Sequence, residues 1–162
     1  MLDITGGSEM TWHKEQPEHL EAERLVASNL ERLWGCKLVK LKNRYSADYA
    51  ALTKDHKLND RVSALIEIKC RPNINRSTYP TAIADINKCK NINSYCNIIH
   101  DCQAFLVYQW QDEAGYIPMQ PPYQVQFMGR TDRGEDERDL YAQFPVDKFK
   151  RLWTGNSVDD WI

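Results

Sequence analysis

The sequence predicts one mixed α/β domain spanning residues 1–162, and three observations lead to this fold class. The chain is long enough to bury one hydrophobic core. Stretches with helical periodicity are interspersed with short stretches of β-branched and aromatic residues, in the order helix, three strands, helix, further strands, helix. No internal repeat, low-complexity tract or long linker divides the chain.

The first predicted helix spans residues 17–34. Pro17 suits the first turn of a helix, and Gly35 ends it. Glu23 lies at the border of the apolar stripe, whereas Glu21 lies toward solvent. The stripe itself consists of Ala22, Leu25, Val26, Leu30, Leu33 and Trp34.

The rest of the chain predicts a sheet with two more helices. Short strands at 36–42, 45–52 and 62–70, with a polar turn at 53–61, predict an antiparallel meander. A basic, polar loop at 71–80 leads into a helix predicted over 81–96. The remaining elements are a strand at 102–111, a hairpin of 123–130 with 139–144 around an acidic turn, and a closing helix over 145–153.

The composition narrows the classes of function. Apolar residues make up 42% of the chain and charged residues 27%, which is typical of a soluble globular protein. The formal net charge of −2 argues against a nonspecific nucleic-acid coat, but it is compatible with an acidic metal site flanked by local basic patches. No apolar run reaches the ~20 residues of a membrane span, and no secretory signal is seen, so we expect a cytoplasmic protein.

The five cysteines are odd in number and form no CxxC pair, which argues against a disulfide framework. Cys89, Cys96 and Cys102 could be metal ligands, but their spacing is long for such a site and favours small buried residues. The four histidines are scattered without the spacing of zinc ligands, and we assign none of them a role.

The stretch ALIEIKC at residues 64–70 places Glu67 and Lys69 on one face of a predicted strand. Such a charge pair costs desolvation energy unless something compensates for it. Asp48 precedes Glu67 with 18 residues between them, so a hairpin of 45–52 with 62–70 can bring the two carboxylates together. Adjacent carboxylates repel, but a divalent cation such as Mg²⁺ or Mn²⁺ removes the repulsion, with Lys69 close to a phosphate.

This arrangement over residues 17–96 resembles the PD-(D/E)XK nuclease superfamily, which includes restriction enzymes, Holliday junction resolvases, phage-type exonucleases and homing endonucleases. The resemblance implies a restriction-endonuclease-like mixed β-sheet flanked by helices. It also implies that Asp48, Glu67 and the carbonyl of Ile68 bind the metal, and that Lys69 is catalytic. Glu23 matches the acidic residue of the superfamily's first helix, which in many members aids a second metal, so the resemblance makes it a catalytic and metal-site candidate, with Glu21 as the alternative. Ala47 stands where the superfamily name has proline.

Basic residues near the motif are candidates for DNA contacts. Arg71 and Arg76 lie in the loop after the motif, where the alternative is a solvated loop. Lys88 follows in the next helix, with Asp85 one turn earlier. Lys37, Lys40 and Lys42 are expected to form an ordinary solvent-facing side. Tyr45 and Tyr79 could stack on bases, but aromatic residues at such positions more often pack in the core.

We therefore expect a metal-dependent deoxyribonuclease, an endonuclease rather than an exonuclease, using Mg²⁺ or Mn²⁺ and acting on DNA as a homo-oligomer or on a particular DNA structure. A phage or mobile-element origin fits this expectation. One alternative is a DNA-binding or assembly protein of the same fold without catalysis. Another is an interaction protein with no nucleic-acid role, for which no salt-sensitive DNA binding is expected.

Overall fold

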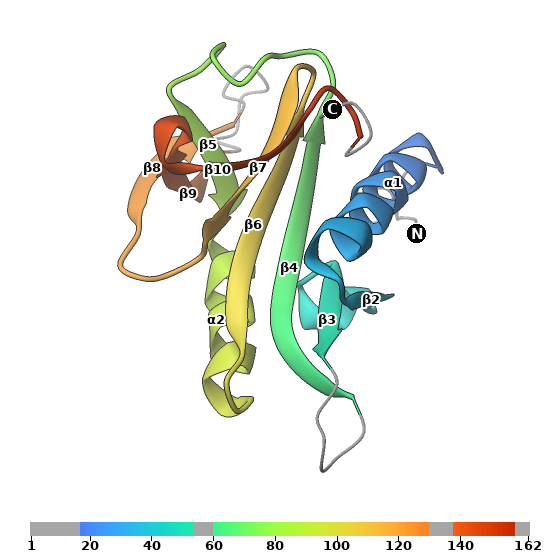
Figure 1. The fold of residues 1–162 in the computed structure, drawn as a ribbon. Coiled ribbons are helices and arrows are strands. Elements are labelled where there is room, and N and C mark those ends of the chain that lie inside the picture. Colours follow the sequence, from blue (N-terminus) through green and yellow to red (C-terminus); the bar gives the residue numbers. More distant parts are fainter. Residues whose placement is uncertain (1–16, 54–59, 130–137, 158–162) are drawn as a thin grey trace, which may run out of the picture.

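The computed structural model describes residues 17–53, 60–129 and 138–157 (Figure 1). The predicted turns at 54–59 and 130–137 lie outside these residues. The helices are α1 (Pro17–Trp34) and α2 (Ile86–Ile98), with short 3₁₀ turns at Asn43–Tyr45 and Val146–Lys148. The strands are β2 (Lys37–Lys40), β3 (Tyr49–Thr53), β4 (Arg61–Arg71), β5 (Thr81–Asp85), β6 (Gln103–Trp110), β7 (Glu113–Pro118), β8 (Gln124–Met128), β9 (Asp139–Pro145) and β10 (Lys150–Thr154).

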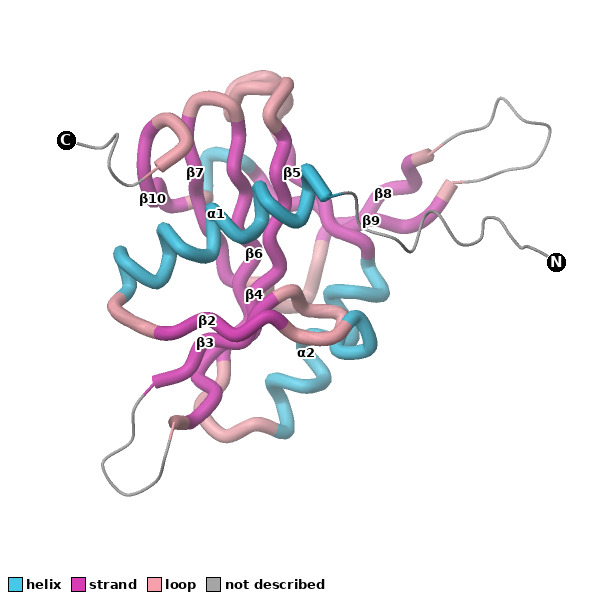
Figure 2. Tube along the Cα trace, turned by 90° about the vertical axis from the view of Figure 1, so that its right-hand side faces the viewer, coloured by secondary structure: helices cyan, strands magenta, loops and turns pink. Residues whose placement is uncertain are grey.

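The strands form two sheets. The larger has the order β10-β7-β6-β4-β3-β2, in which β4 and β6 are parallel and all other neighbours are antiparallel. The smaller is antiparallel, with the order β5-β9-β8. Figure 2 shows β8 and β9 extending away from the main sheet. This mixed sheet with helices confirms the predicted restriction-endonuclease-like α/β fold.

The two helices cover opposite faces of β4. Side chains alternate between the two faces of a strand, so successive residues of β4 contact different helices. Ile66 and Ile68 pack with Val26, Ala27 and Leu30 of α1 in one core cluster, whereas Leu25 of the predicted stripe is 57% exposed. Leu65 packs with Cys89 and Ile92 of α2 in the other. β4 is thus buried on both faces, as a central strand with a parallel neighbour should be. Neither helix is long and apolar enough to cross a membrane, among the residues described.

Several sequence predictions are confirmed, including the helix at 17–34, the antiparallel arrangement of the first three strands and the hairpin of β8 with β9. The helix predicted over 81–96 is wrong in its first turn, because residues 81–85 form β5 and pair with β9. The closing helix predicted over 145–153 is also wrong. Residues 146–148 form only a 3₁₀ turn, and 150–154 pair with β7, a strand that the sequence did not predict.

Candidate active site

Asp48 lies directly before β3 and faces Glu67 across the sheet. Tyr49 pairs with Ile66, and the antiparallel pairing continues one residue further, with the N–H of Asp48 donating to the carbonyl of Ile66 at 2.9 Å. The loop before β3 also joins the sheet, because the N–H of Leu41 donates to the carbonyl of Asp48 at 2.9 Å. The backbone of Asp48 is therefore fixed on both sides, as the hairpin prediction required.

The backbone pairing of β3 with β4 ends at Asp48. Beyond it, the side chain of Asp48 makes the next contact with β4. Its Oδ2 accepts a hydrogen bond from the N–H of Ile68 at 2.8 Å. In a strand, the N–H and C=O of one residue point to the same side. The carbonyl of Ile68 therefore faces the Asp48 carboxylate, on the side of β4 opposite β6. This is the position that a backbone metal ligand needs.

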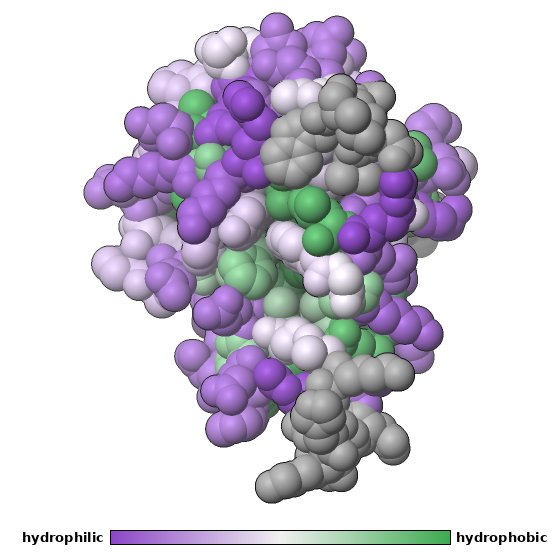
Figure 3. All heavy atoms as spheres, viewed as in Figure 1, coloured by the Kyte–Doolittle hydropathy of each residue, from purple (hydrophilic) through white to green (hydrophobic). Residues whose placement is uncertain are grey.

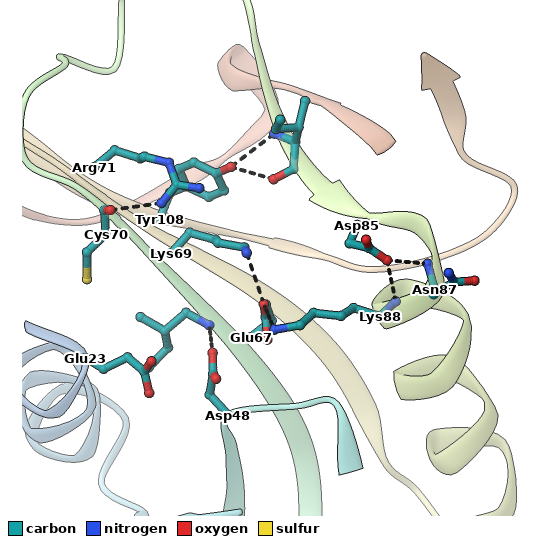
Figure 4. A network of polar contacts seen from close by, with 12 residues as sticks. Glu23, Asp48, Glu67, Lys69, Cys70, Arg71, Asp85, Asn87, Lys88 and Tyr108 are labelled. Carbon is teal, nitrogen blue, oxygen red and sulfur yellow. Dashed lines mark hydrogen bonds and ion pairs between the residues drawn. The ribbon is translucent and has the colours of Figure 1, made fainter. Parts of the chain in front are cut away.

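Glu67 is the most deeply buried charged residue of the site, with 1% of its surface exposed. Its Oε2 lies 3.1 Å from the Nζ of Lys88 and 3.4 Å from the Nζ of Lys69 (Figure 4). Its Oε1 is buried and has no hydrogen-bond partner among the described residues. A buried oxygen without a partner costs about 1–3 kcal/mol, and more for a charged group. Such an atom indicates that a ligand completes the site.

The surroundings of Glu67 favour its protonated form. Burial is the largest cause and the negative charge of Asp48 the second, and together they raise the pKa of Glu67 from 4.5 to about 7. Lys69 and Lys88 act in the opposite direction but do not cancel these two effects. A bound cation would stabilise the ionised carboxylate, so metal binding and proton release at Glu67 should be coupled.

Glu23 reaches the same site from α1, although it lies on the other face of the sheet. Its Oε1 accepts a hydrogen bond from the Nζ of Lys40 at 2.8 Å, and that nitrogen lies 3.7 Å from Oδ1 of Asp48. Lys40 is exposed, as predicted, but the prediction of an ordinary solvent-facing residue missed its contact with two site carboxylates. Lys40 pairs with Tyr49, the residue after Asp48. The sequence left the register of β2 with β3 open, and that register is the signal that would have placed Lys40 beside Asp48. Glu21 instead pairs with Arg24 on the exposed side of α1.

Arg71 and Lys88 line the same cavity as Asp48 and Glu67. The guanidinium of Arg71 lies 5.8 Å from the centre of the Tyr108 ring, above the sheet. Lys88 stands in the first turn of α2. Asp85 caps that helix, because its Oδ1 accepts hydrogen bonds from the N–H groups of Asn87 and Lys88. Asp85 thus positions Lys88 rather than facing the cavity itself.

The structure places Arg76 away from the site. Its guanidinium donates to Oε1 of Glu113 at 3.0 Å and to the carbonyls of Val146 and Phe149, both at 2.6 Å. Its N–H donates to Asp112. These bonds tie the loop after β4 to the end of the chain, so Arg76 has a structural role and does not join the proposed DNA contacts.

The cavity at this edge has a volume of about 480 Å³ and also contains His19, Asn43, Ser46 and Cys70. Sequence reasoning gave no role to these four residues. Burial raises the pKa of Cys70 to about 11, so its sulfur stays a thiol near neutral pH. The carboxylate and carbonyl oxygens of the cavity suit Mg²⁺ or Mn²⁺, whereas a thiol that stays protonated does not favour a thiolate-bound metal.

The residues present fit a hydrated divalent ion. Among the described residues, no three His, Cys, Asp or Glu side chains converge closely enough to form a complete ligand set. Mg²⁺ commonly keeps several waters and binds through one or two carboxylates together with phosphate oxygens. Asp48, Glu67 and the Ile68 carbonyl supply that kind of partial set, and the unpartnered Oε1 of Glu67 is an oxygen that such an ion can engage.

The fold is that of the PD-(D/E)XK nuclease superfamily. Residues 13–152 match the family described as "Phage putative PDDEXK endonuclease", and the chain belongs to that family. The match includes Glu23, Asp48, Glu67 and Lys69. No curated protein matches the chain significantly.

Proposed function

We propose that this protein is a divalent-metal-dependent endonuclease that hydrolyses phosphodiester bonds in DNA. The observation that carries the proposal is the convergence of Asp48, the Ile68 backbone and Glu67 at the edge of β4, with a buried Glu67 oxygen that lacks a partner. The family description supports an endonuclease rather than an exonuclease.

Each residue has a distinct part in this proposal. Asp48, Glu67 and the Ile68 carbonyl would hold Mg²⁺ or Mn²⁺. Glu23 would act from α1 through Lys40, whose ammonium group lies near both Glu23 and Asp48. Such an ion, when bound by these residues, would supply a Lewis acid at the phosphate and would make a bound water more acidic. Lys69 donates from Nζ to a phosphate oxygen and orients the attacking water. A bond forms between the water oxygen and phosphorus, and the bond from phosphorus to one sugar oxygen breaks.

Plasmid nicking tests the assignment. Supercoiled DNA should be cut with Mg²⁺ or Mn²⁺ and remain intact with chelator. Asp48→Asn and Lys69→Ala should each lower the rate by a factor of about 100 or more. Lys148→Ala, in an exposed 3₁₀ turn, is the matched control and should cut at the wild-type rate. Unchanged cutting by both site variants would refute the assignment of these residues.

A panel of substrates then distinguishes the type of nuclease. Linear, circular, single-stranded and four-way-junction DNA should be incubated under the same conditions. Cutting of circular DNA defines an endonuclease, whereas loss of linear DNA alone defines an exonuclease. We also propose that two copies act together on duplex DNA, since one site cuts one strand at a time. Light scattering with and without DNA measures the number of copies.

A further inference from the structure

A second pocket of about 380 Å³ lies next to the candidate active site, between the face of the large sheet at β4 and β6 and the strands β5 and β8 of the small sheet. Arg71 lines both pockets and so connects them. The second pocket is also lined by Tyr79, Thr81, Tyr108, Trp110 and Gln126. Figure 3 shows the face of the molecule seen in Figure 1, where hydrophilic side chains cover most of the surface and apolar atoms lie near its middle.

The pairing of β4 with β6 shows which residues connect the two pockets. Lys69 pairs with Tyr108, and Arg71 pairs with Trp110. Because side chains on one face of a strand repeat every two residues, Arg71 follows Lys69 at about 6.6 Å. Beyond the acidic cluster, the same face of the sheet therefore continues with a cation and two aromatic rings.

The inner wall of the second pocket is aromatic and held in place. The rings of Tyr108 and Trp110 lie 5.3 Å apart. The hydroxyl of Tyr108 donates to the carbonyl of Ile83 and accepts from its N–H, which fixes the ring against the edge of β5. At the rim, Tyr79 is 59% exposed, so the prediction that it packs in the core is wrong.

Polar groups lie along one side of this wall. Thr81 lies two residues before Ile83, so its N–H and C=O are on the same edge of β5 as those that contact Tyr108. The side-chain amide of Gln126 adds a donor from β8, while its oxygen accepts a hydrogen bond from the side-chain amide of Gln143. Tyr108 and Trp110 are 3% and 2% exposed, so the aromatic ring available for stacking is that of Tyr79 at the rim. An exposed ring with hydrogen-bonding groups nearby is what an unstacked nucleobase requires.

We propose that the second pocket binds the base of an unpaired nucleotide adjacent to the phosphate that is cut, with Arg71 contacting the phosphate between the two pockets. This inference rests on the proposed nuclease function and narrows its substrate to DNA with a single-stranded or splayed nucleotide at the cleavage position. A fully paired base is stacked in the duplex and cannot enter the pocket without being extruded.

Two matched probes test for the base directly. Thymidine 5′-monophosphate and deoxyribose 5-phosphate carry the same phosphate, but only the first has a base. In ¹⁵N NMR spectra of the full chain with chelator, thymidine 5′-monophosphate should shift the amide signals of Thr81 and Ile83 and the indole signal of Trp110. Deoxyribose 5-phosphate should leave these signals in place. Equal shifts with both probes, or shifts with neither, would overturn the proposal.

An exposed aromatic residue provides the variant. Tyr79→Ala should weaken the binding of single-stranded dT10 in chelator about tenfold, as expected for the loss of one stacking partner, and leave blunt duplex binding unchanged. Phe127→Ala is the control, because Phe127 is 64% exposed but faces the opposite side of β8 from Gln126. Equal weakening of single-stranded and duplex binding would overturn the base pocket.

The two proposals fail in different ways. If thymidine 5′-monophosphate and dT10 bind as described but the enzyme cuts none of the circular, linear, single-stranded and four-way-junction substrates, the nuclease assignment fails and the base pocket stands as a DNA-binding site. If the plasmid is cut and Tyr79→Ala binds dT10 as tightly as wild type, the base pocket fails and the nuclease assignment stands.

Discussion

Replacing Glu67 with glutamine should stabilise the metal-free protein at alkaline pH. Glutamine has the shape of the protonated acid, which is the form that burial and Asp48 favour. In the wild-type protein at pH 8, a carboxylate is held in a nearly inaccessible position with one oxygen unpartnered. The variant removes this unfavourable charge, although it also removes a proposed metal ligand.

The size of the effect follows from the pKa of Glu67. Below pH 4.5 the acid is protonated in both the folded and unfolded states, and well above pH 7 it is ionised in both. Between these values the folded protein keeps a proton that the unfolded chain has lost, so the free energy of unfolding falls as pH rises. A pKa raised from 4.5 to about 7 corresponds to a total loss of about 3 kcal/mol.

Urea unfolding in chelator, at intervals from pH 5 to pH 8.5, measures this difference. The stability of Glu67→Gln relative to wild type should increase by about 3 kcal/mol across this range. At pH 8, Mg²⁺ should stabilise wild type and leave the variant unchanged, because ligand binding to the folded state adds to the free energy of unfolding. A stability difference that stays constant with pH would refute the reasoning about burial.

Glu113 provides a contrasting buried carboxylate. Its Oε1 lies 3.0 Å from Nη1 of Arg76 and 3.1 Å from Nε of Arg151, so it has the partners that Glu67 Oε1 lacks. Glu113→Gln should destabilise the protein by about 2 kcal/mol, since two charge-assisted hydrogen bonds are weakened. If the two Glu→Gln substitutions change the free energy of unfolding in opposite directions, the effect at Glu67 is caused by its own surroundings and not by the loss of a carboxylate in general.

Three further predictions concern the residues around the site. Arg76→Met should lower the free energy of unfolding by about 3 kcal/mol in urea titrations, because it removes one of the two cations that pair with Glu113 and the donor to two backbone carbonyls. DNA affinity per folded molecule should stay at the wild-type value. Lys88→Ala should move the pH midpoint of Mg²⁺-dependent cutting upward, since this lysine lowers the pKa of Glu67, whereas Lys90→Ala on the exposed side of α2 should leave it in place. Asp85→Ala should cost about 1 kcal/mol in thermal or urea unfolding through the loss of the α2 cap, and an unchanged midpoint would refute the capping role.

The parts of the fold that the sequence predicts well are those decided by local signals. Pro17 and Gly35 mark the ends of α1 because each residue has a strong conformational preference at a helix boundary. The strand at 61–71 is recognisable from its apolar content, and a hairpin with the preceding strand places Asp48 opposite Glu67. Local signals therefore sufficed to bring together the acidic part of the candidate site.

The errors occur where partners distant in the sequence decide the structure. Residues 81–85 fit a helical pattern as well as a strand, and only their pairing with β9, more than 50 residues later, selects the strand. β10 forms because β7 is available beside it, and neither strand was predicted. The lysine contacts have the same origin. Lys40 and Lys88 reach the carboxylates through the positions of β2 and α2, which their own sequences do not determine.

The charge distribution reconciles an acidic protein with a DNA substrate. The whole chain carries −2, but the candidate site has more positive than negative side chains. Its carboxylates are Glu23, Asp48 and Glu67, and its cations are Lys40, Lys69, Arg71 and Lys88. One divalent ion would add two positive charges to this excess, so phosphate attraction would be strongest in the metal-loaded protein. The acidic cluster then does not oppose DNA binding, because the same carboxylates that repel phosphate in the free protein hold the ion that attracts it.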